Sequence, residues 1–229
     1  MLNSLSRRAG RTGAAGLACL VLFLLPRLQA YEAPLGSASI QEAWTLGQRD
    51  DQVTANLVSQ YVKQITEGAQ TAPRIAEIEV LTPFLQVVDQ SRQNLSGYTE
   101  LQAVEDYHKR GDTVVIRVLL MLPAAYPRPK DSHSPVTPSQ GETTDLRSEN
   151  FWQTFRFNVK QHGRPLVPRS IQSKPVYSAA TKDTPSVLDG ATVWLLYDAK
   201  DVVSDEIVVE IITPGGKTIA TTFLLNALR

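Results

Sequence analysis

One histidine of this sequence stands beside carboxylates, where it could do acid/base chemistry. His108 follows Glu105 and Asp106 in a segment with helical spacing. A histidine held against a carboxylate can act as a general acid/base pair, so a hydrolase with these residues in its site is one hypothesis. The alternative, which we favour, is a cationic side chain that stabilises the C-terminal end of a helix.

Acidic residues cluster in a second place, between two predicted strands. Oxygen ligands on a loop can hold calcium, and this weak calcium candidate comprises Asp198, Asp201, Asp205 and Glu206. Their spacing differs from that of an EF-hand, and acidic residues in a connection usually serve solubility. The three histidines also lack the close spacing of zinc ligands. We therefore predict no metal site.

A tryptophan and two basic residues suggest a binding surface. Phe151, Phe155 and Phe157 fall on one side of a predicted strand, which places Trp152, Arg156 and Lys160 on the wet side. An exposed aromatic ring beside two cations can bind a protein partner or a sugar. The competing interpretation is that another segment covers Trp152.

Motifs for nucleophilic or phosphate chemistry are missing from the sequence. It has no Gly-x-Ser-x-Gly elbow, and Gly215-Gly216-Lys217 lies in a predicted hairpin turn with no helix after it, unlike a phosphate-binding loop. We therefore predict neither a catalytic residue nor a cofactor, and we favour a protein that is not an enzyme.

The first thirty residues have the three parts of an export signal. Arg7, Arg8 and Arg11 form a basic start, residues 17–25 are uncharged and apolar, and Ala30 offers a small residue for cleavage. The apolar run is shorter than the roughly 20 residues that span a bilayer. We predict a cleaved signal peptide at 1–30 and a periplasmic or secreted protein. The alternative is an anchor retained through residues 17–25.

Removal of residues 1–30 would leave a cysteine-free, mildly acidic chain. Cys19 is the one cysteine, so the remainder offers no disulfide and no thiolate ligand. The first thirty residues hold four arginines and no acid, so the remainder carries 19 basic and 23 acidic residues, a formal charge of −4. This balance gives no support to a nucleic-acid partner, and membrane contact is expected only through an uncleaved signal.

The next segment, residues 31–72, is predicted to be a leader followed by an amphipathic helix. One apolar stripe with spacings of three and four runs through Val53, Leu57, Val58, Tyr61, Val62 and Ile65. Residues 43–46 suggest a shorter helical turn before it.

Short strands dominate residues 73–229. We predict strands at 78–88, 113–122, 151–160, 166–177, 192–197, 207–212 and 217–225, with one short inserted helix at 96–110 whose apolar stripe is Leu101, Val104 and Tyr107 or His108. A flexible proline-rich loop is predicted at 123–148. If the strand at 217–225 forms a sheet edge, it could add to a partner's sheet.

These elements predict an α+β protein that is mainly β. We expect an antiparallel, immunoglobulin-like β-sandwich with an N-terminal amphipathic helix and one short inserted helix. The predicted function is a non-catalytic protein-interaction or structural module whose partner is an unknown protein or extracellular ligand. Carbohydrate binding and a hydrolase with an unrecognised site are the alternatives.

Overall fold

The computed structural model describes residues 31–49, 51–66, 71–123, 148–179 and 186–229. The predicted signal peptide at 1–30 lies outside these residues, and so does nearly all of the predicted proline-rich loop at 123–148. None of the helices in the described ranges is long and apolar enough to cross a membrane.

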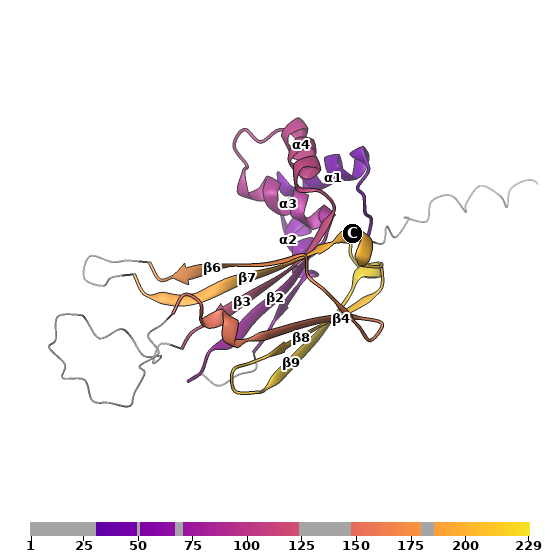
Figure 1. Ribbon diagram of the computed structural model, residues 1–229. Helices are drawn as coiled ribbons and strands as arrows, with labels where there is room; N and C mark the ends of the chain where they lie inside the picture. Colours follow the sequence, from indigo (N-terminus) through magenta and orange to yellow (C-terminus); the bar gives the residue numbers. More distant parts are fainter. Residues whose placement is uncertain (1–30, 50, 67–70, 124–147, 180–185) are drawn as a thin grey trace, which may run out of the picture.

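The described strands form two antiparallel sheets, which confirms a mainly β protein built from paired sheets (Figure 1). Sheet A has the strand order β1 (Val62–Gln64), β2 (Arg74–Leu81), β3 (Thr113–Met121), β7 (Leu188–Asp198), β6 (Ser170–Tyr177). Sheet B has the order β5 (Arg164–Leu166), β4 (Arg156–Gln161), β8 (Glu206–Ile212), β9 (Thr218–Leu224).

Alternate side chains of the two sheets form the core. Ile78, Val118 and Val193 lie directly opposite one another across β2, β3 and β7, and all three are fully buried. In sheet B, Val159 pairs with Val209, and both are buried. Because side chains alternate along a strand, the residues between these apolar positions point to the outer faces of the sheets.

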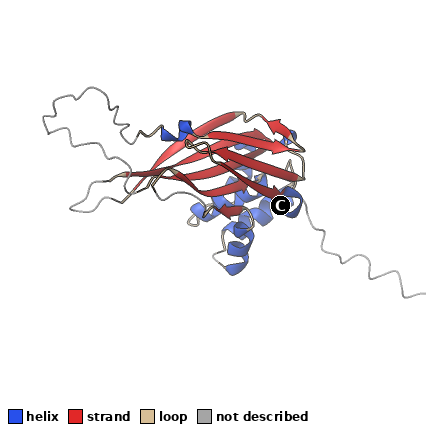
Figure 2. Ribbon diagram, turned by 90° about the horizontal axis from the view of Figure 1, so that it is seen from below, coloured by secondary structure: helices blue, strands red, loops and turns tan. Residues whose placement is uncertain are grey.

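Helices cover one end of sheet A, on the side away from sheet B, and Figure 2 shows them gathered on one side of the strands. They are α1 (Ser37–Gly47), α2 (Gln52–Ser59), α3 (Pro83–Gln93) and α4 (Glu100–Arg110). At the contact of α1 with α3, a Cβ atom on Gly47 would lie 2.3 Å from the Cβ of Ser91. Gly47 therefore allows the two helix backbones to approach closely.

The predicted strand at 78–88 is wrong in its second half, where α3 begins. Strand β2 ends at Leu81, and the hydroxyl oxygen of Thr82 then accepts a hydrogen bond from the backbone N–H of Leu85 (3.2 Å). Thr82 is thus a helix N-cap, and Pro83 occupies the first helical position, where its missing N–H costs nothing. The described part therefore has a second inserted helix besides the predicted one.

The predicted helical stripe from Val53 to Ile65 does not form one helix. Helix α2 ends at Ser59, and Val62 belongs to β1, where it pairs with Glu79 of β2. The side chain of Val53 is 59% exposed, whereas Tyr61 is fully buried between the two elements. Pairing with β2 satisfies the backbone of residues 62–64, which overrides their helical spacing.

The predicted inserted helix corresponds to α4, and its predicted apolar stripe is buried only in part. Thr99 and Gln102 form a capping box at its start, and Gly111 follows its last residue with a positive φ of 76°. The buried side chains are Ala103 and Tyr107, whereas Leu101 is 68% exposed. The prediction of Leu101 as a core residue is therefore wrong.

Strands in the second half are mostly where the sequence predicts them. The hairpin of β8 and β9 is confirmed, as is the central position of β3 in sheet A. The predicted strand at 166–177 is divided between the two sheets. Its first residue, Leu166, ends β5 in sheet B, and its residues 170–177 form β6 in sheet A. Residues 166–170 therefore carry the chain from one sheet to the other.

Candidate functional site

Only two of the three residues of the predicted binding surface share a strand face in the structure. Trp152 lies in the 3-10 turn η1 (Phe151–Thr154), not in a strand, because β4 begins only at Arg156. Its ring packs against the core, and its Nε1 atom is buried without a hydrogen-bond partner among the described residues. Arg156 and Lys160 do share the outer face of β4, but the Lys160 Nζ lies 2.6 Å from Glu210 Oε2 on β8.

The predicted calcium ligands also have separate surroundings. Asp198 ends β7, where its Oδ1 lies 3.4 Å from Nη1 of Arg169, and Asp205 Oδ2 lies 2.7 Å from Nε2 of His162. Asp201 and Glu206 are exposed at the turn η2 (Ala199–Asp201) and at the first residue of β8. The connection that carries them joins β7 of sheet A to β8 of sheet B. No group of three metal-ligating side chains occurs among the described residues.

The histidine beside two carboxylates lies on an exposed helix end. His108 is in the last turn of α4 together with Lys109 and Arg110, and its ring contacts that of Tyr107. Lys109 Nζ lies 3.9 Å from Glu105 Oε2, a contact along the helix surface. This position fits three basic side chains that stabilise a helix C-terminus.

A buried acid lies on the outer face of sheet A, beneath α3. Glu79 of β2 pairs directly with Arg117 of β3 and contacts its guanidinium, and Arg117 Nη1 also lies 3.6 Å from Asp89 Oδ2 on α3. The Glu79 side chain is 3% exposed. Burial raises the pKa of Glu79 to about 7, although the positive charge of Arg117 opposes the shift. This pair was not predicted from the sequence, although Arg117 is the one charged residue of the apolar strand β3 and is a usable signal.

A small cavity of about 280 Å³ lies where the leader meets the ends of α4 and β7. Its lining includes Asp112 and Asp198, each of which already has a partner. The Tyr107 hydroxyl donates to Asp112 and accepts a hydrogen bond from the backbone N–H of Leu35 (2.7 Å). Burial raises the pKa of Tyr107 to about 12. These bonds hold the leader against α4.

Three of the four edges of the two described sheets carry features that oppose the addition of another strand. β5 is three residues long and contains Pro165, β1 is equally short and contains Lys63, and β6 contains Lys174 followed by Pro175. Short length, lysine and proline are the usual means of protecting an edge, because they hinder pairing with another chain.

The fourth edge, β9, has none of these features. Its seven residues from Thr218 to Leu224 include no charge and no proline. β8 hydrogen-bonds it on one side, and no described residue forms a hydrogen bond with its other side. This unpaired side presents a row of backbone donors and acceptors. We call it the β9 edge.

A groove of about 520 Å³ runs beside the β9 edge, toward β1 of the other sheet. Its lining is apolar apart from a few side chains, and comprises Gln60, Lys63, Thr222, Phe223, Leu224, Ala227 and Leu228. Phe223 and Leu228 are buried, while Thr222 and Leu224 are exposed. The contribution of β1 was not foreseen, because the sequence predicts a helix there.

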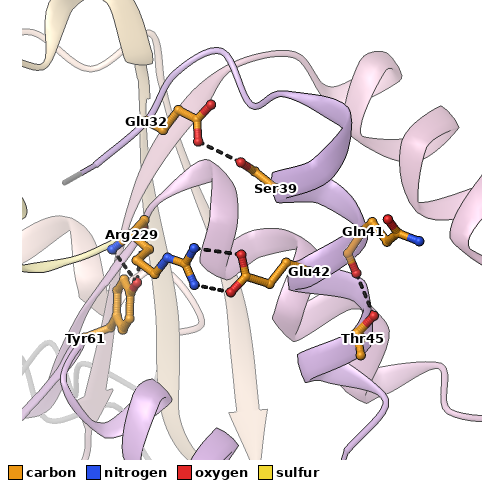
Figure 3. Close-up of polar contacts among 7 residues, drawn as sticks. All are labelled: Glu32, Ser39, Gln41, Glu42, Thr45, Tyr61 and Arg229. Atoms are coloured by element: carbon orange, nitrogen blue, oxygen red, sulfur yellow. Dashed lines mark hydrogen bonds and ion pairs between the residues drawn. The ribbon is translucent and has the colours of Figure 1, made fainter. Parts of the chain in front are cut away.

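The side chain of Arg229 contacts α1 (Figure 3). Its guanidinium makes two contacts with the Glu42 carboxylate of α1, one of them Nη2 to Oε2 at 2.7 Å. The same guanidinium lies over the ring of Phe84, 4.9 Å from its centroid. A two-pronged arginine–carboxylate contact fixes direction as well as distance. The segment after β9 is therefore attached to α1 across the molecule.

The backbone of Arg229 is held as well. Its N–H donates to the Tyr61 hydroxyl (2.9 Å), and its carbonyl accepts from Tyr61 (3.1 Å) and from Thr82. Burial raises the pKa of Tyr61, so this hydroxyl keeps its proton at neutral pH. Tyr61 lies directly before β1, so these bonds fix the distance between β1 and the end of β9. We call Glu42, Tyr61, Thr82 and Arg229 the clamp.

The α1 side of the clamp has its own fixed geometry, also drawn in Figure 3. Glu32 precedes α1 and lies at its N-terminal end. Ser39 donates a hydrogen bond to its Oε2 (2.7 Å), and the backbone N–H of Gly36 donates to its Oε1 (3.3 Å). A carboxylate at a helix N-terminus is favourable because it meets unpaired N–H groups. The helix that carries Glu42 is thereby oriented from its first turn.

No family model, no curated protein and no solved structure matches this chain. Its function therefore has to be argued from the geometry. The β9 edge offers backbone groups for hydrogen bonding, and the groove offers apolar surface with one charge. This combination suits the recognition of an extended polypeptide.

Proposed function

We propose that this protein is an exported, non-catalytic interaction module that binds an extended segment of another protein along the β9 edge. One observation carries the proposal: β9 is the single described edge strand of this length without charge or proline. Main-chain hydrogen bonds would supply affinity, and side chains entering the groove would supply specificity. The immunoglobulin-like type of the sandwich belongs to the same proposal.

Export is supported by the first thirty residues alone. Their basic start, apolar run and Ala30 are typical of a cleaved signal. The test is to sequence the N-terminus of the protein recovered outside the cytoplasm, where we expect Tyr31 as the first residue. A product that begins at Met1 and stays in the cytosol would contradict this part of the proposal.

Binding along β9 can be tested with two matched lysine substitutions. Ala220 of β9, Glu210 of β8 and Asn158 of β4 lie in one row across sheet B, and Ala220 and Asn158 are both exposed. Ala220→Lys places a charge at the edge, whereas Asn158→Lys places the same charge two strands away. The probe is a library of displayed random nonapeptides selected on each protein.

We expect Ala220→Lys to weaken binding of the selected peptides at least tenfold, because a charged side chain at an edge disfavours strand pairing. Asn158→Lys should leave the affinity for the selected peptides within about a factor of two of the wild-type value. Fluorescence anisotropy with a labelled peptide measures both. Equal binding by all three proteins, or no peptide enriched above a bare support, would overturn the proposal.

A further inference from the structure

The groove faces the side chains that an added strand would turn inward. Successive side chains of a strand point to opposite faces, so every second residue of a segment paired with β9 would point toward the space between the sheets. In β9 itself, the inward residues at this end are Thr221 and Phe223. The inward residues of an added strand would therefore lie beside Phe223, over the groove.

Lys63 reaches the same space from the opposite sheet. It pairs directly with Ile78 of β2, and directly opposed residues project from the same face of a sheet. Ile78 is fully buried in the core. The exposed Lys63 side chain therefore leaves β1 on the face of sheet A that looks toward sheet B, at the rim of the groove.

Among the described residues that line the groove, Lys63 is also the one with a charge. It forms no ion pair with any residue in the described part of the chain. Its stem lies beside apolar surface while its ammonium group can reach water, as lysine side chains commonly do. A carboxylate brought there by a bound segment would meet an unopposed positive charge.

Building on the proposed function, we infer that the segment bound at β9 carries apolar side chains and one carboxylate in its inward row. Its inward apolar side chains pack on Phe223 and Leu228, and a carboxylate of the segment pairs with the Lys63 ammonium. Partial burial on the groove wall makes this pair stronger than one in free solvent. A basic residue in the same place would be repelled, which gives the groove its selectivity.

The test compares the displayed nonapeptide library on the wild-type protein, on Lys63→Glu and on Lys174→Glu. Lys174 is an exposed lysine of β6, at the opposite edge of sheet A, so its charge reversal controls for the overall change in charge. From the wild type and from Lys174→Glu we expect peptides in which an acidic residue stands among apolar ones at every second position, and from Lys63→Glu peptides with a basic residue in that place. Lys63→Arg should keep the acidic preference.

Binding of one selected acidic peptide then gives the magnitude. Lys63→Glu should weaken it about tenfold, and raising the salt concentration from about 0.05 to 0.5 M should reduce the difference, because exposed charges are screened. If Lys63→Glu changes neither selection nor affinity while Ala220→Lys still abolishes binding, the acidic preference is wrong and strand addition stands. If Ala220→Lys has no effect, both proposals fail.

Discussion

The two open sides of the sandwich are built in opposite ways. On one side lie β5 and β6, where Pro165, Lys174 and Pro175 interrupt both edges. On the other side lie β1 and β9, where a short strand faces a longer one that carries neither charge nor proline. The first side is protected by its residue types, and the second is left able to pair.

The clamp lies on the unprotected side. Arg229 joins α1 and Tyr61 there, so the position of β9 relative to β1 is fixed by side chains and not by strand pairing. An edge intended for binding has to be held in place without being covered. The exposure of the β9 edge therefore comes from the residues of β9 itself, whereas the rigidity of its surroundings comes from the clamp, whose residues lie elsewhere in the sequence.

The largest expected effect comes from removing the centre of the clamp. Tyr61→Ala should lower the free energy of unfolding by about 4 kcal/mol, because it leaves a cavity and removes two hydrogen bonds to the backbone of Arg229. Tyr61→Phe, which loses only the hydroxyl, should cost about 1–2 kcal/mol. Urea denaturation measures both.

Tyr177→Ala is the matched control on the protected side. Tyr177 is a tyrosine of β6 whose side chain is 46% exposed, compared with 0% for Tyr61. Its loss should shift the unfolding midpoint far less than Tyr61→Ala. Equal shifts would mean that the clamp contributes no more than any surface contact, and the comparison of the two sides would fail.

The second effect concerns pH and the strand that supports β1. Glu79 pairs with Val62 of β1, and its pKa is raised from 4.5 to about 7 in the folded protein. Between these values the folded state binds the proton more tightly than the unfolded state, so stability falls as the pH rises, by about 3 kcal/mol in total. Glu79→Gln should remove this slope.

The measurement is urea denaturation at several pH values between 4.5 and 7.5, with Glu77→Gln as the control. Glu77 lies on the same face of β2, two residues away, and is less buried. The control should keep the slope of the wild type. If the free energy of unfolding has the same slope against pH in Glu79→Gln and in the wild type, the raised pKa of Glu79 in the folded protein is contradicted.

The third prediction converts the protected side into a binding edge. Lys174→Thr combined with Pro175→Thr gives β6 an uncharged edge able to donate its hydrogen bonds. We expect the selected peptide to bind with two sites per protein, or the protein to self-associate at high concentration. Titration with the labelled peptide and sedimentation velocity distinguish these results. One site and no self-association would show that residue type alone does not protect β6.

The smallest expected effect is at the predicted binding surface on β4. Lys160→Ala removes an ion pair with Glu210 on the outer face of sheet B and should cost less than about 1 kcal/mol. Binding of the peptide at β9 should not change. A tenfold loss of binding would move the interaction surface from the β9 edge to the outer face of sheet B, as the sequence first suggested.

The sequence predicted the regular strands well and the transitions between elements poorly. β3 and the β8–β9 hairpin were predicted because their residues alternate or are continuously apolar and end at turn residues. The boundary at Thr82 and Pro83 was missed because a proline after apolar residues fits both an interrupted strand and the first turn of a helix. The threonine before the proline favours the helix, because threonine is a common N-cap residue.

The candidate site was half predictable for the same reason. Strand 217–225 was expected to bind a partner if it lay at an edge, but the sheet order that makes β9 an edge depends on long-range pairing. Lys63 was hidden in a stretch with helical spacing, which strand pairing with β2 overrides. Trp152 was misplaced because the alternation of phenylalanines extends into a 3-10 turn.

The clamp also bears on the order in which the molecule assembles. Glu42 and Arg229 are separated by 187 positions in the chain, and closing so long a loop has a large entropic cost that only many other contacts can offset. We expect a contact of so long a range to form after the local hairpins. The β9 edge should therefore take its final place only after both sheets exist, and a partly folded chain would not yet offer a finished binding surface.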